Sequence, residues 1–538
     1  MSAPAGRAVR VVRVDSVAVA APELTQGSLR PEHPVARRLP DLAAAFGLPA
    51  SGVPAGVLVS GVTVASGEAR PGDLFVAVPG LKVHGARYAD QAAQRGAVAV
   101  LTDDEGASAA AGAGLPVLVA PDPRALAGPV AAWVYDEPAR RLVTVGVTGT
   151  NGKTTTSYFV DAALRAVHPL TAVLGTVELR IGDDAIESPR TTVEAPVLQA
   201  ICALAAERGA TALTTEVSSH GLALGRLAGM TFDVAGFTNL QRDHLDFHGD
   251  MEGYFAAKAS LFDPALARRG VVVVDDAWGR RLAAQAPIPV ETVATHAEDP
   301  QQADWQVVEA QIGLDGVGST FVLRGPDGAR HQASSPLPGL VNVSNAAAAI
   351  VLAHAAGVDL RTAIEAVAHA HEIPGRMERV VERGGGLPLC LVDYAHTPDA
   401  LVLALEAVRP ITPGRLVIVF GSDGDRDRGK RPIMGAIAAR LADVLVVTDE
   451  NPRSEEPGAI RRAILEGARQ ERPDGRDVVE ITTSRADAIR YAMSVAGDED
   501  TVIVTGKGHE PTQEIAGVFH RYNDRDVFRA VRDERAAS

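Results

Sequence analysis

Short runs of apolar, largely β-branched residues recur along the chain, and stretches with helical periodicity separate most of them. The clearest runs are 74–78, 97–101, 116–120, 142–147, 213–219, 234–240, 271–274, 389–394, 416–420, 444–449 and 501–506. Apolar strands that alternate with helices are typical of parallel sheets covered on both faces. The pattern predicts an α/β fold, with a small antiparallel excursion in the more polar stretch at about 295–335.

The 538 residues leave room for about three domains of ~150 residues each. Residues 1–40 are rich in Pro, Arg and Ala and lack periodicity, so we expect a flexible arm there. We place a small α/β domain at 41–140, a central parallel sheet of the P-loop ATPase type at 141–373, and a Rossmann-like domain at 374–538. The strands of the last domain end in polar or glycine residues, where open α/β sheets bind ligands.

Composition narrows the class of protein. Hydrophobic residues make up 46% and charged residues 22% of the chain, as in ordinary folded proteins. The net charge of −15 argues against nucleic acid as a partner. No apolar run is long enough for a secretory signal or a membrane span. The two cysteines, Cys202 and Cys390, lie too far apart for a metal motif, so we expect a cytoplasmic protein.

A glycine-punctuated turn with a Lys-Thr pair follows the run at 142–147. Gly152, Lys153 and Thr154 match the end of the nucleotide-binding loop, whose backbone N–H groups surround phosphates. Val147 stands where that loop usually begins with glycine, and the extra Gly149 makes a shorter turn. Lys153 would neutralise phosphates and the Thr154 hydroxyl would bind Mg²⁺. A chance glycine-rich turn is the alternative, which the strand–loop–helix order disfavours.

Two further stretches carry metal-binding side chains. Glu216 ends an apolar run, and its buried carboxylate would need either a bound Mg²⁺ or a salt bridge. His244 and His248 lie four residues apart, which on a helix would suggest a zinc pair. Asn239, Asp243 and Asp246 are interleaved with them, so we expect a loop with oxygen ligands suited to Mg²⁺. A polar loop without metal fits this stretch equally well.

Many separate motifs keep one order along the chain. They are GTNGKTT (149–155), EVSSHGL (216–222), TNLQRDHLDFHG (238–249), YFAAKASLF (254–262), NVSNAAAA (342–349), IPGRMERV (373–380), VDYAHTPDAL (392–401), GDRDRGKRP (424–432), ENPRSEEP (450–457) and GKGHE (506–510). In this order they resemble the Mur ligases of peptidoglycan synthesis, over about residues 66–526. Within that family the chain is most similar to the members that add diaminopimelate.

The resemblance implies a reaction. In these enzymes ATP phosphorylates a carboxylate of UDP-MurNAc-L-Ala-D-Glu, and the amine of meso-2,6-diaminopimelate attacks the acyl phosphate, releasing ADP and phosphate. It also implies Mg²⁺, a monomer, and one substrate for each domain: the UDP-linked substrate for the first, ATP for the second and the amino acid for the third. Cations near the phosphoryl group suit this chemistry because charge spreads over its oxygens.

The resemblance also implies site residues. The ATP-binding set is Gly149, Thr150, Asn151, Gly152, Lys153, Thr154, Thr155, Asn345, Arg376, Asp393 and His396. The metal ligands are Thr154, Glu216, His244 and Lys258, the last carried as a carbamate (N6-carboxylysine). Lys153, Lys258 and His244 are the catalytic residues. Apart from the resemblance, Lys258 is interpreted as a solvated helix lysine.

Two more sets follow from the same motifs. The UDP-MurNAc-dipeptide set is Ser66, Thr191, Thr192, Ser218 and Arg226, with Val193 in place of the family's usual proline and Ala65-Ser66-Gly67 in place of Asp-Ser-Arg. The diaminopimelate set is Arg426, Glu450, Asn451, Pro452, Arg453, Gly506 and Glu510. A guanidinium can hold the second carboxylate of diaminopimelate at two points, so Arg453 predicts selection against lysine. Glu450 stands where the family usually has Asp, a change that we expect to be tolerated.

Other functions share part of this set of motifs. Lysine addition and the related dipeptide-adding step are the nearest, and Arg453 and the GKGHE stretch speak against them. A folylpolyglutamate synthase would share the phosphate loop but not the C-terminal motifs. A nucleotide switch would need an Asn-Lys-x-Asp stretch, which the sequence lacks, and an inactive scaffold would not need Lys153, Glu216 and Lys258 together.

Overall fold

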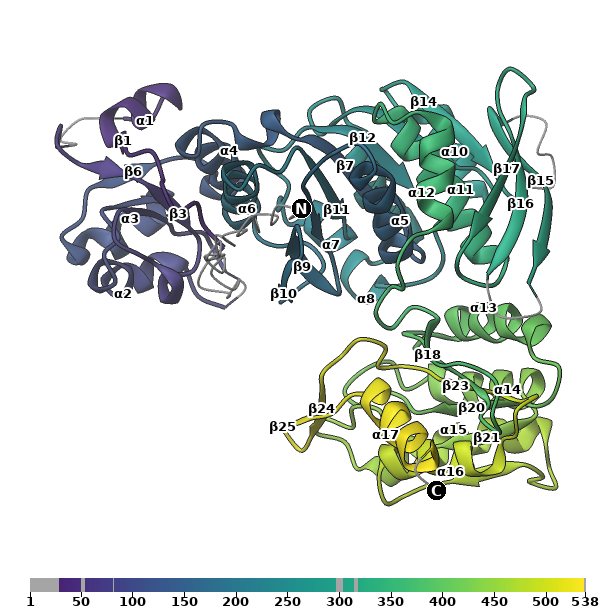
Figure 1. The fold of residues 1–538 in the computed structure, drawn as a ribbon. Helices are drawn as coiled ribbons and strands as arrows, with labels where there is room; N and C mark the ends of the chain where they lie inside the picture. The colour runs from purple at the N-terminus through teal and green to yellow at the C-terminus, as the bar shows by residue number, and fades with distance from the viewer. Residues whose placement is uncertain (1–28, 50–53, 81, 297–302, 314–317, 537–538) are drawn as a thin grey trace, which may run out of the picture.

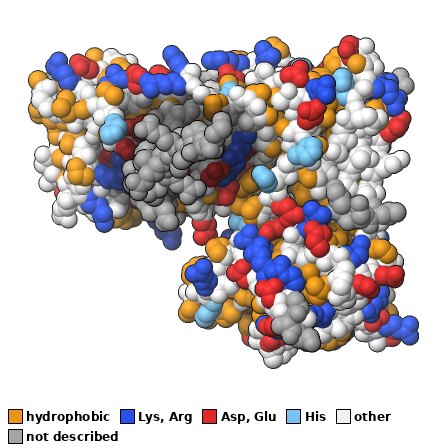
Figure 2. All heavy atoms as spheres, viewed as in Figure 1, with side chains coloured by type: hydrophobic (Ala, Val, Ile, Leu, Met, Phe, Trp, Pro, Cys, Tyr) orange, Lys and Arg blue, Asp and Glu red, His pale blue; other side chains and the backbone are white. Residues whose placement is uncertain are grey.

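The computed structural model describes residues 29–49, 54–80, 82–296, 303–313 and 318–536. They form three α/β bodies, and the predicted fold class is confirmed. The N-terminal body and the C-terminal body are both attached to the central one (Figure 1). A space-filling view shows an open angle between the two outer bodies (Figure 2). Within the described part of the chain, no helix is sufficiently long and apolar to cross a bilayer.

The N-terminal body contains a parallel sheet whose strands follow chain order: β3 (Gly61–Thr63), β4 (Asp73–Val76), β5 (Ala99–Thr102) and β6 (Val117–Val119). Helices α2 (Ala89–Gln94), α3 (Asp104–Ala110) and α4 (Pro123–Val134) connect or follow these strands. Strand β1 (Arg37–Arg38), which precedes α1 (Leu39–Ala45), pairs with β2 (Leu58–Val59).

The flexible arm predicted for residues 1–40 is wrong for its last part. Leu29 is buried in an apolar cluster of the central body, and Arg30 forms an ion pair with the buried Asp73 of β4. These contacts fasten residues 29 and 30 to the folded bodies, and the chain then enters β1 and α1, whose first residue, Leu39, is buried. Residues 1–28 lie outside the described residues.

The central body is built on a sheet with the order β10-β9-β8-β11-β7-β12-β13-β14-β15-β16-β17. Its parallel part runs from β8 (Thr171–Leu174) through β11 (Ala212–Glu216), β7 (Val143–Thr148), β12 (Phe232–Phe237), β13 (Ala267–Val273) and β14 (Val290–Ala294) to β15 (Trp305–Ile312). The predicted excursion is confirmed as β15, β16 (Ser319–Arg324) and β17 (Arg330–Ser335), which pair antiparallel. Strands β9 (Glu178–Ile181) and β10 (Asp184–Glu187) add a second antiparallel edge that we did not predict.

Helices cover both faces of the central sheet. On one face α5 (Lys153–Arg165) packs with α11 (Leu340–Ala355) and α12 (Leu360–Ala368). Other helices of this body are α6 (Ala195–Glu207), α7 (Ser219–Ala223), α8 (Leu245–His248), α9 (Met251–Ala259) and α10 (Ala277–Gln285). The strand–loop–helix unit β7–α5 stands in the middle of the sheet, so its loop opens at the carboxyl ends of the parallel strands.

The C-terminal body has the sheet order β18-β19-β23-β20-β21-β22, in which only β18 is antiparallel. Its strands are β18 (Glu378–Val381), β19 (Leu389–Val392), β20 (Leu416–Phe420), β21 (Val444–Val447), β22 (Val478–Glu480) and β23 (Thr501–Val504). Its helices are α13 (Pro398–Val408), α14 (Lys430–Leu441), α15 (Pro457–Glu471), α16 (Arg485–Val495) and α17 (Asp524–Ala536). A separate hairpin, β24 (Thr512–Ile515) and β25 (Val518–Arg521), projects from this body (Figure 1).

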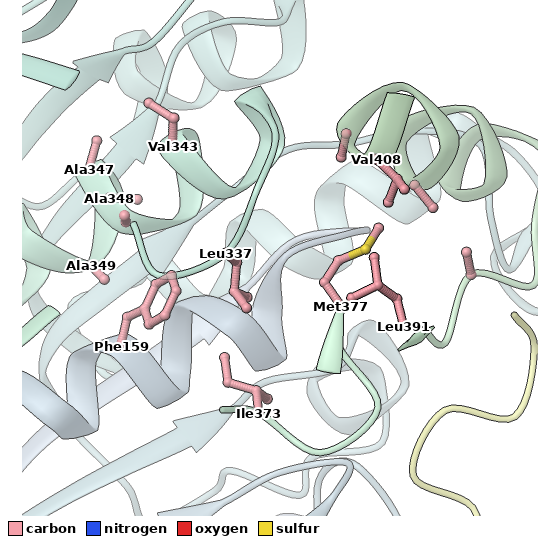
Figure 3. Close-up of a cluster of buried hydrophobic side chains, with 14 of the residues drawn as sticks. Phe159, Leu337, Val343, Ala347, Ala348, Ala349, Ile373, Met377, Leu391 and Val408 are labelled. Atoms are coloured by element: carbon pink, nitrogen blue, oxygen red, sulfur yellow. The ribbon is translucent and has the colours of Figure 1, made fainter. Parts of the chain in front are cut away.

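One apolar cluster joins the central and C-terminal bodies. It includes Phe159 of α5, Val343 of α11, Met377, Leu391 of β19 and Val408 of α13 (Figure 3). Gly339, before α11, packs so closely on α13 that a Cβ there would lie 2.3 Å from that of Ala407. The two bodies therefore meet through packed side chains.

Candidate active site

A cavity of about 330 Å³ lies between the central and C-terminal bodies. Its central-body wall includes the predicted residues Thr150, Asn151, Gly152, Lys153, Thr154, Thr155, Thr191, Glu216, His244 and Asn345, and its C-terminal wall includes Arg376, Asp393 and His396. Apart from Thr191, these residues come from six separate motifs of the sequence. The structure thus brings the predicted nucleotide and metal side chains to one place, with Gly149 directly before the lining stretch.

The turn between β7 and α5 depends on glycine at two positions. Gly149 and Gly152 have φ angles of +151° and +85°, which L side chains rarely adopt. A Cβ at Gly152 would lie 2.3 Å from Oδ1 of Asn345, and one at Gly149 would lie 1.9 Å from Oγ1 of Thr238. Valine at position 147 replaces the motif's first glycine. The loop can still be short, because Gly149 and Gly152 make the turn.

Lys153 begins α5, and its ammonium lies over the loop. Its Nζ donates to the carbonyls of Gly149 at 3.0 Å and Thr150 at 2.9 Å. Burial lowers the pKa of Lys153, while Glu216 and Asp243 oppose that shift. A lysine at this place supplies positive charge at the amino end of a helix, where phosphates bind.

Glu216 is the last residue of β11 and is 1% exposed. Its Oε2 accepts from the hydroxyls of Thr154 at 3.0 Å and Thr176 at 2.9 Å, and its Oε1 accepts from the Thr176 backbone N–H at 2.8 Å. Within the described residues no Lys, Arg or His forms an ion pair with it, so the salt-bridged alternative is not what the structure contains. A buried carboxylate bonded only to hydroxyls and an amide is suited to a cation ligand.

The histidine stretch differs from the loop that we predicted, because residues 245–248 form one helical turn, α8. His244 precedes this turn with φ +53°, and its Nε2 lies 3.3 Å from Oδ2 of Asp243. The ring of His220 stands 4.8 Å from that of His244, and Nε2 of His248 lies 3.0 Å from the Ser219 hydroxyl. Burial lowers the pKa of His244, which favours the neutral imidazole that binds metals.

The zinc pair considered for this stretch is not formed. His248 is bonded to a serine hydroxyl, and His244 lies beside a carboxylate. Among the residues that the structure describes, no group of three or more His, Cys, Asp or Glu side chains is arranged to hold a metal ion. The Thr154 hydroxyl, at the end of the glycine-rich loop, is bonded to the carboxylate of Glu216. These two oxygen donors fit Mg²⁺.

Lys258 is not the solvated helix lysine of the simplest interpretation. It is 1% exposed, its Nζ donates to the carbonyl of Gly149 at 2.7 Å, and the ammonium lies 4.7 Å from the centre of the Tyr254 ring. Burial lowers the pKa of Lys258 well below its usual value, and the neighbouring Lys153 adds to this effect. A neutral amine is the form of lysine that reacts with carbon dioxide, so the environment suits a carbamate.

The C-terminal wall faces the loop through Arg376. Its Nη2 donates to the hydroxyl of Thr154 at 3.3 Å, and its guanidinium lies 4.4 Å from the centre of the Tyr394 ring. Asp393 accepts from the backbone N–H groups of Met377 and Ala395, each at 2.9 Å. Burial raises the pKa of Asp393. Arg376 therefore links the two walls directly.

The residues predicted for the UDP-linked substrate divide between two bodies. The hydroxyls of Thr192 and Ser218 lie 3.0 Å apart, the Thr191 hydroxyl lies 3.1 Å from that of Thr176, and Arg226 donates to the carbonyl of Thr192 at 3.3 Å. Ser66 lies in the N-terminal body, where its hydroxyl donates to the side chain of Gln91 at 2.7 Å. Val193 is buried in the apolar core of the central body, so this replacement of proline has a packing role.

Apart from Arg426, the residues predicted for the amino acid follow β21 and β23. Asn451 Nδ2 donates to Glu510 Oε2 at 3.0 Å, and Arg453, with φ +52°, has its Nη2 3.3 Å from Oδ2 of Asp423. The Glu450 carboxyl is buried against Gly506, where a Cβ would lie 2.4 Å from Oε2. Arg426 is exposed on the segment before α14.

Three side chains of this region were missed. Thr176 holds Glu216 through two bonds, Tyr394 stacks under Arg376, and Lys507 bonds to both Asn451 and Glu510. The signal for Lys507 and Tyr394 was present, since both stand at strand ends inside motifs that we quoted. Thr176 had no such signal because β8, the strand before it, was not predicted.

The fold and this cavity define a three-body α/β protein with a glycine-rich loop at the carboxyl ends of its central parallel strands. Family models match at 58–129 (Mur ligase family, catalytic domain), 147–353 (Mur ligase middle domain) and 375–508 (Mur ligase, glutamate ligase domain). This chain belongs to the Mur ligase family.

Relatives extend the likeness to nearly the whole chain. The UDP-N-acetylmuramoyl-L-alanyl-D-glutamate–2,6-diaminopimelate ligase of Streptomyces avermitilis is 48% identical over 504 residues, covering 94% of this chain and 98% of its own. The UDP-N-acetylmuramyl-tripeptide synthetase of Leifsonia xyli is 49% identical over 510 residues, covering 93% and 97%. A solved structure of a UDP-N-acetylmuramoyl-L-alanyl-D-glutamate–2,6-diaminopimelate ligase has 31% identity and a TM-score of 0.66, covering 94% of this chain and all of that one.

Proposed function

We propose that the chain is an ATP-dependent ligase that adds meso-2,6-diaminopimelate to UDP-MurNAc-L-Ala-D-Glu in the synthesis of peptidoglycan precursors. The relative at 48% identity, which carries the name of this activity, supports the reaction. The observation that carries the choice of amino acid is Arg453, a cation two residues after Asn451, which is itself bonded to Glu510. We further propose that the enzyme works as a monomer in the cytoplasm.

The reacting carboxylate is a poor electrophile until it is phosphorylated, so the site must hold a phosphoryl donor beside it. The turn at Gly149–Gly152 and the amino end of α5 would bind the phosphates, with Lys153 neutralising their charge. Arg376 and Glu216 both bond to the Thr154 hydroxyl. Arg376 would therefore place a second cation over the transferred phosphoryl group. Asn345, Asp393 and His396 would hold the rest of the nucleotide in the cavity.

Mg²⁺ would be held by Thr154, Glu216 and His244, with Lys258 contributing as a carbamate. The ion would neutralise charge on the phosphoryl oxygens. Glu216 supports this proposal because its buried carboxylate lacks an ion pair within the described residues. Lys258 supports it because burial favours the uncharged amine, and a carbamate at that nitrogen would turn a cation into an anion.

The remaining substrates would lie on either side of this centre. Thr191, Thr192, Ser218 and Arg226 form a polar group beside Glu216, suited to the carboxylate-bearing dipeptide, and Ser66 would meet the uridine end from the N-terminal body. Diaminopimelate would enter from the C-terminal body. Its second carboxylate would pair with Arg453 and its ammonium with Glu510, whereas lysine has no group for Arg453.

The deciding experiment is phosphate release from ATP with UDP-MurNAc-L-Ala-D-Glu as acceptor, comparing meso-diaminopimelate with L-lysine. We expect turnover with diaminopimelate and a kcat/KM for lysine lower by at least about a hundredfold, as for a site whose charged group is left unpaired. Equal use of the two amino acids, or a preference for lysine, would refute the assignment of the substrate.

A further inference from the structure

Lys507 lies in the segment between β23 and β24, and its side chain is completely buried. Its Nζ donates to three acceptors: Oδ1 of Asn451 at 2.9 Å, Oε2 of Glu510 at 3.1 Å and the carbonyl of Thr512 at 2.6 Å. An ammonium has three protons, so all of its donors are used. A buried cation is tolerated only with such complete pairing.

Two of these acceptors belong to the side chains assigned to the amino acid. Asn451 Oδ1 accepts from Lys507 and, at 3.2 Å, from the backbone N–H of Glu514, while its Nδ2 donates to Glu510 Oε2. A flipped amide would point its NH₂ at two donors, so Lys507 fixes the orientation of Asn451. Glu510 accepts from both Lys507 and Asn451 through its Oε2. Its other carboxylate oxygen, Oε1, accepts from the Tyr394 hydroxyl at 3.4 Å.

The third acceptor anchors the hairpin that supports Arg453. Thr512 begins β24, and two residues later the Glu514 carbonyl accepts from the Arg453 backbone N–H at 3.1 Å. The Ala516 N–H donates back to the Arg453 carbonyl at 2.7 Å. These bonds hold Arg453 in the left-handed backbone region, which is costly for a residue other than glycine unless the surroundings impose it.

We propose that Lys507 is the positioning residue for amino-acid selection. It orients the side chains of Asn451 and Glu510 and ties both to strand β24, and therefore to Arg453. This inference rests on the proposed function, since it takes Asn451, Arg453 and Glu510 as the groups that receive the amino acid. Lys507 itself has no free donor for the substrate, so its role is indirect. A merely stabilising lysine would affect all three substrates alike.

The test is Lys507→Met, which keeps an unbranched side chain that is one atom shorter and removes the charge. We expect the KM for meso-diaminopimelate to rise at least about tenfold, the scale of one charged hydrogen bond, with the KM values for ATP and UDP-MurNAc-L-Ala-D-Glu within about twofold of the parent. Lys507→Arg keeps the charge but not three converging donors on one atom, so we expect an intermediate KM.

Arg415→Met is the matched control. It removes a cation that pairs with Asp500 at 3.0 Å at the amino end of β20, the edge of the sheet opposite the site. Its three KM values should equal those of the parent. Thermal unfolding of each variant shows which ones are folded, and Lys507→Arg decides the question if Lys507→Met does not fold.

Parental KM for diaminopimelate in folded Lys507→Met, or in Lys507→Arg where only that variant folds, would overturn the inference. An equal rise in all three KM values would also overturn it, because it would show general destabilisation. A parent enzyme with no turnover of diaminopimelate would refute the proposed function, which is a separate result.

Discussion

Replacing Arg453 with alanine should damage the use of diaminopimelate specifically. The guanidinium has its Nη2 3.3 Å from Asp423, its Nε lies 3.9 Å from Glu514, and a quarter of the side chain is exposed. It is therefore held in place but still reachable by a substrate. Its backbone is fixed by strand β24, so truncation of the side chain should leave the loop where it is.

The size of the effect follows from the pair that is lost. Removing one partner of a hydrogen-bonded charge pair in a partly buried site costs about 2–4 kcal/mol, which corresponds to about 30- to 1,000-fold in kcat/KM. L-lysine has no second carboxylate, so its kcat/KM should change by less than about threefold in the same variant. The ratio of these two effects measures the pairing alone, as in a double-mutant cycle.

The assay is phosphate release at saturating ATP and UDP-MurNAc-L-Ala-D-Glu, with either amino acid varied. Arg462→Ala is a suitable control, because that arginine is an exposed residue of α15 paired with Glu456 at 3.4 Å. It should leave both amino acids unaffected. If Arg453→Ala reduced activity equally with both amino acids, or raised the KM for ATP, the arginine would not be reading the second carboxylate.

Three further predictions concern the supporting structure. Gly152→Ala places a Cβ 2.3 Å from Asn345 Oδ1 at φ +85°, so the KM for ATP should rise at least about tenfold in steady-state kinetics; an unchanged KM would contradict this account of the turn. Burial raises the pKa of Glu450 to about 8, so between pH 4.5 and 8 the folded state holds a proton that the unfolded state has lost, and stability falls as pH rises. The thermal stability of Glu450→Gln relative to the parent should therefore increase from pH 5 to pH 8, and a constant difference would argue against it. Asp524→Asn leaves the buried Arg485 without its carboxylate partner and should lower the free energy of unfolding in urea by about 3–5 kcal/mol. The double variant Arg485→Met/Asp524→Leu should recover most of this loss. If Asp524→Asn were as stable as the parent, the pair would be dispensable.

The fold class could be predicted because buried parallel strands appear in the sequence as short apolar runs. Every predicted run overlaps an observed strand, and 416–420 matches β20 residue for residue. Two of the strands that escaped prediction are polar or exposed, since β10 alternates between partly buried and exposed residues and β25 is exposed throughout, whereas β8 is buried along its whole length but only four residues long. Their pairing comes from neighbouring strands, which no local pattern can show.

The candidate site could be predicted only where a motif marks it. The phosphate loop was visible locally, since its glycines and Lys153 are consecutive. Lys258 was marked by the family motif but not by its local pattern, because the carbonyl that its buried ammonium contacts belongs to Gly149, more than a hundred residues away in the chain. The helical turn at α8 was missed because oxygen-rich side chains suggested a loop. Side chains whose role depends on distant contacts need the fold before they can be interpreted.

The apolar cluster shared by α5, α11 and α13 limits how the chain can be divided for expression (Figure 3). A fragment that stopped before Pro374 would remove Met377, Leu391 and Val408 from the cluster to which Phe159 and Val343 belong. Such a fragment would expose apolar surface and tend to precipitate. The core of the N-terminal body includes residues of β4 and α4 and takes one buried member, Ala200 of α6, from the central body, so this body is the better candidate for isolation as a separate piece.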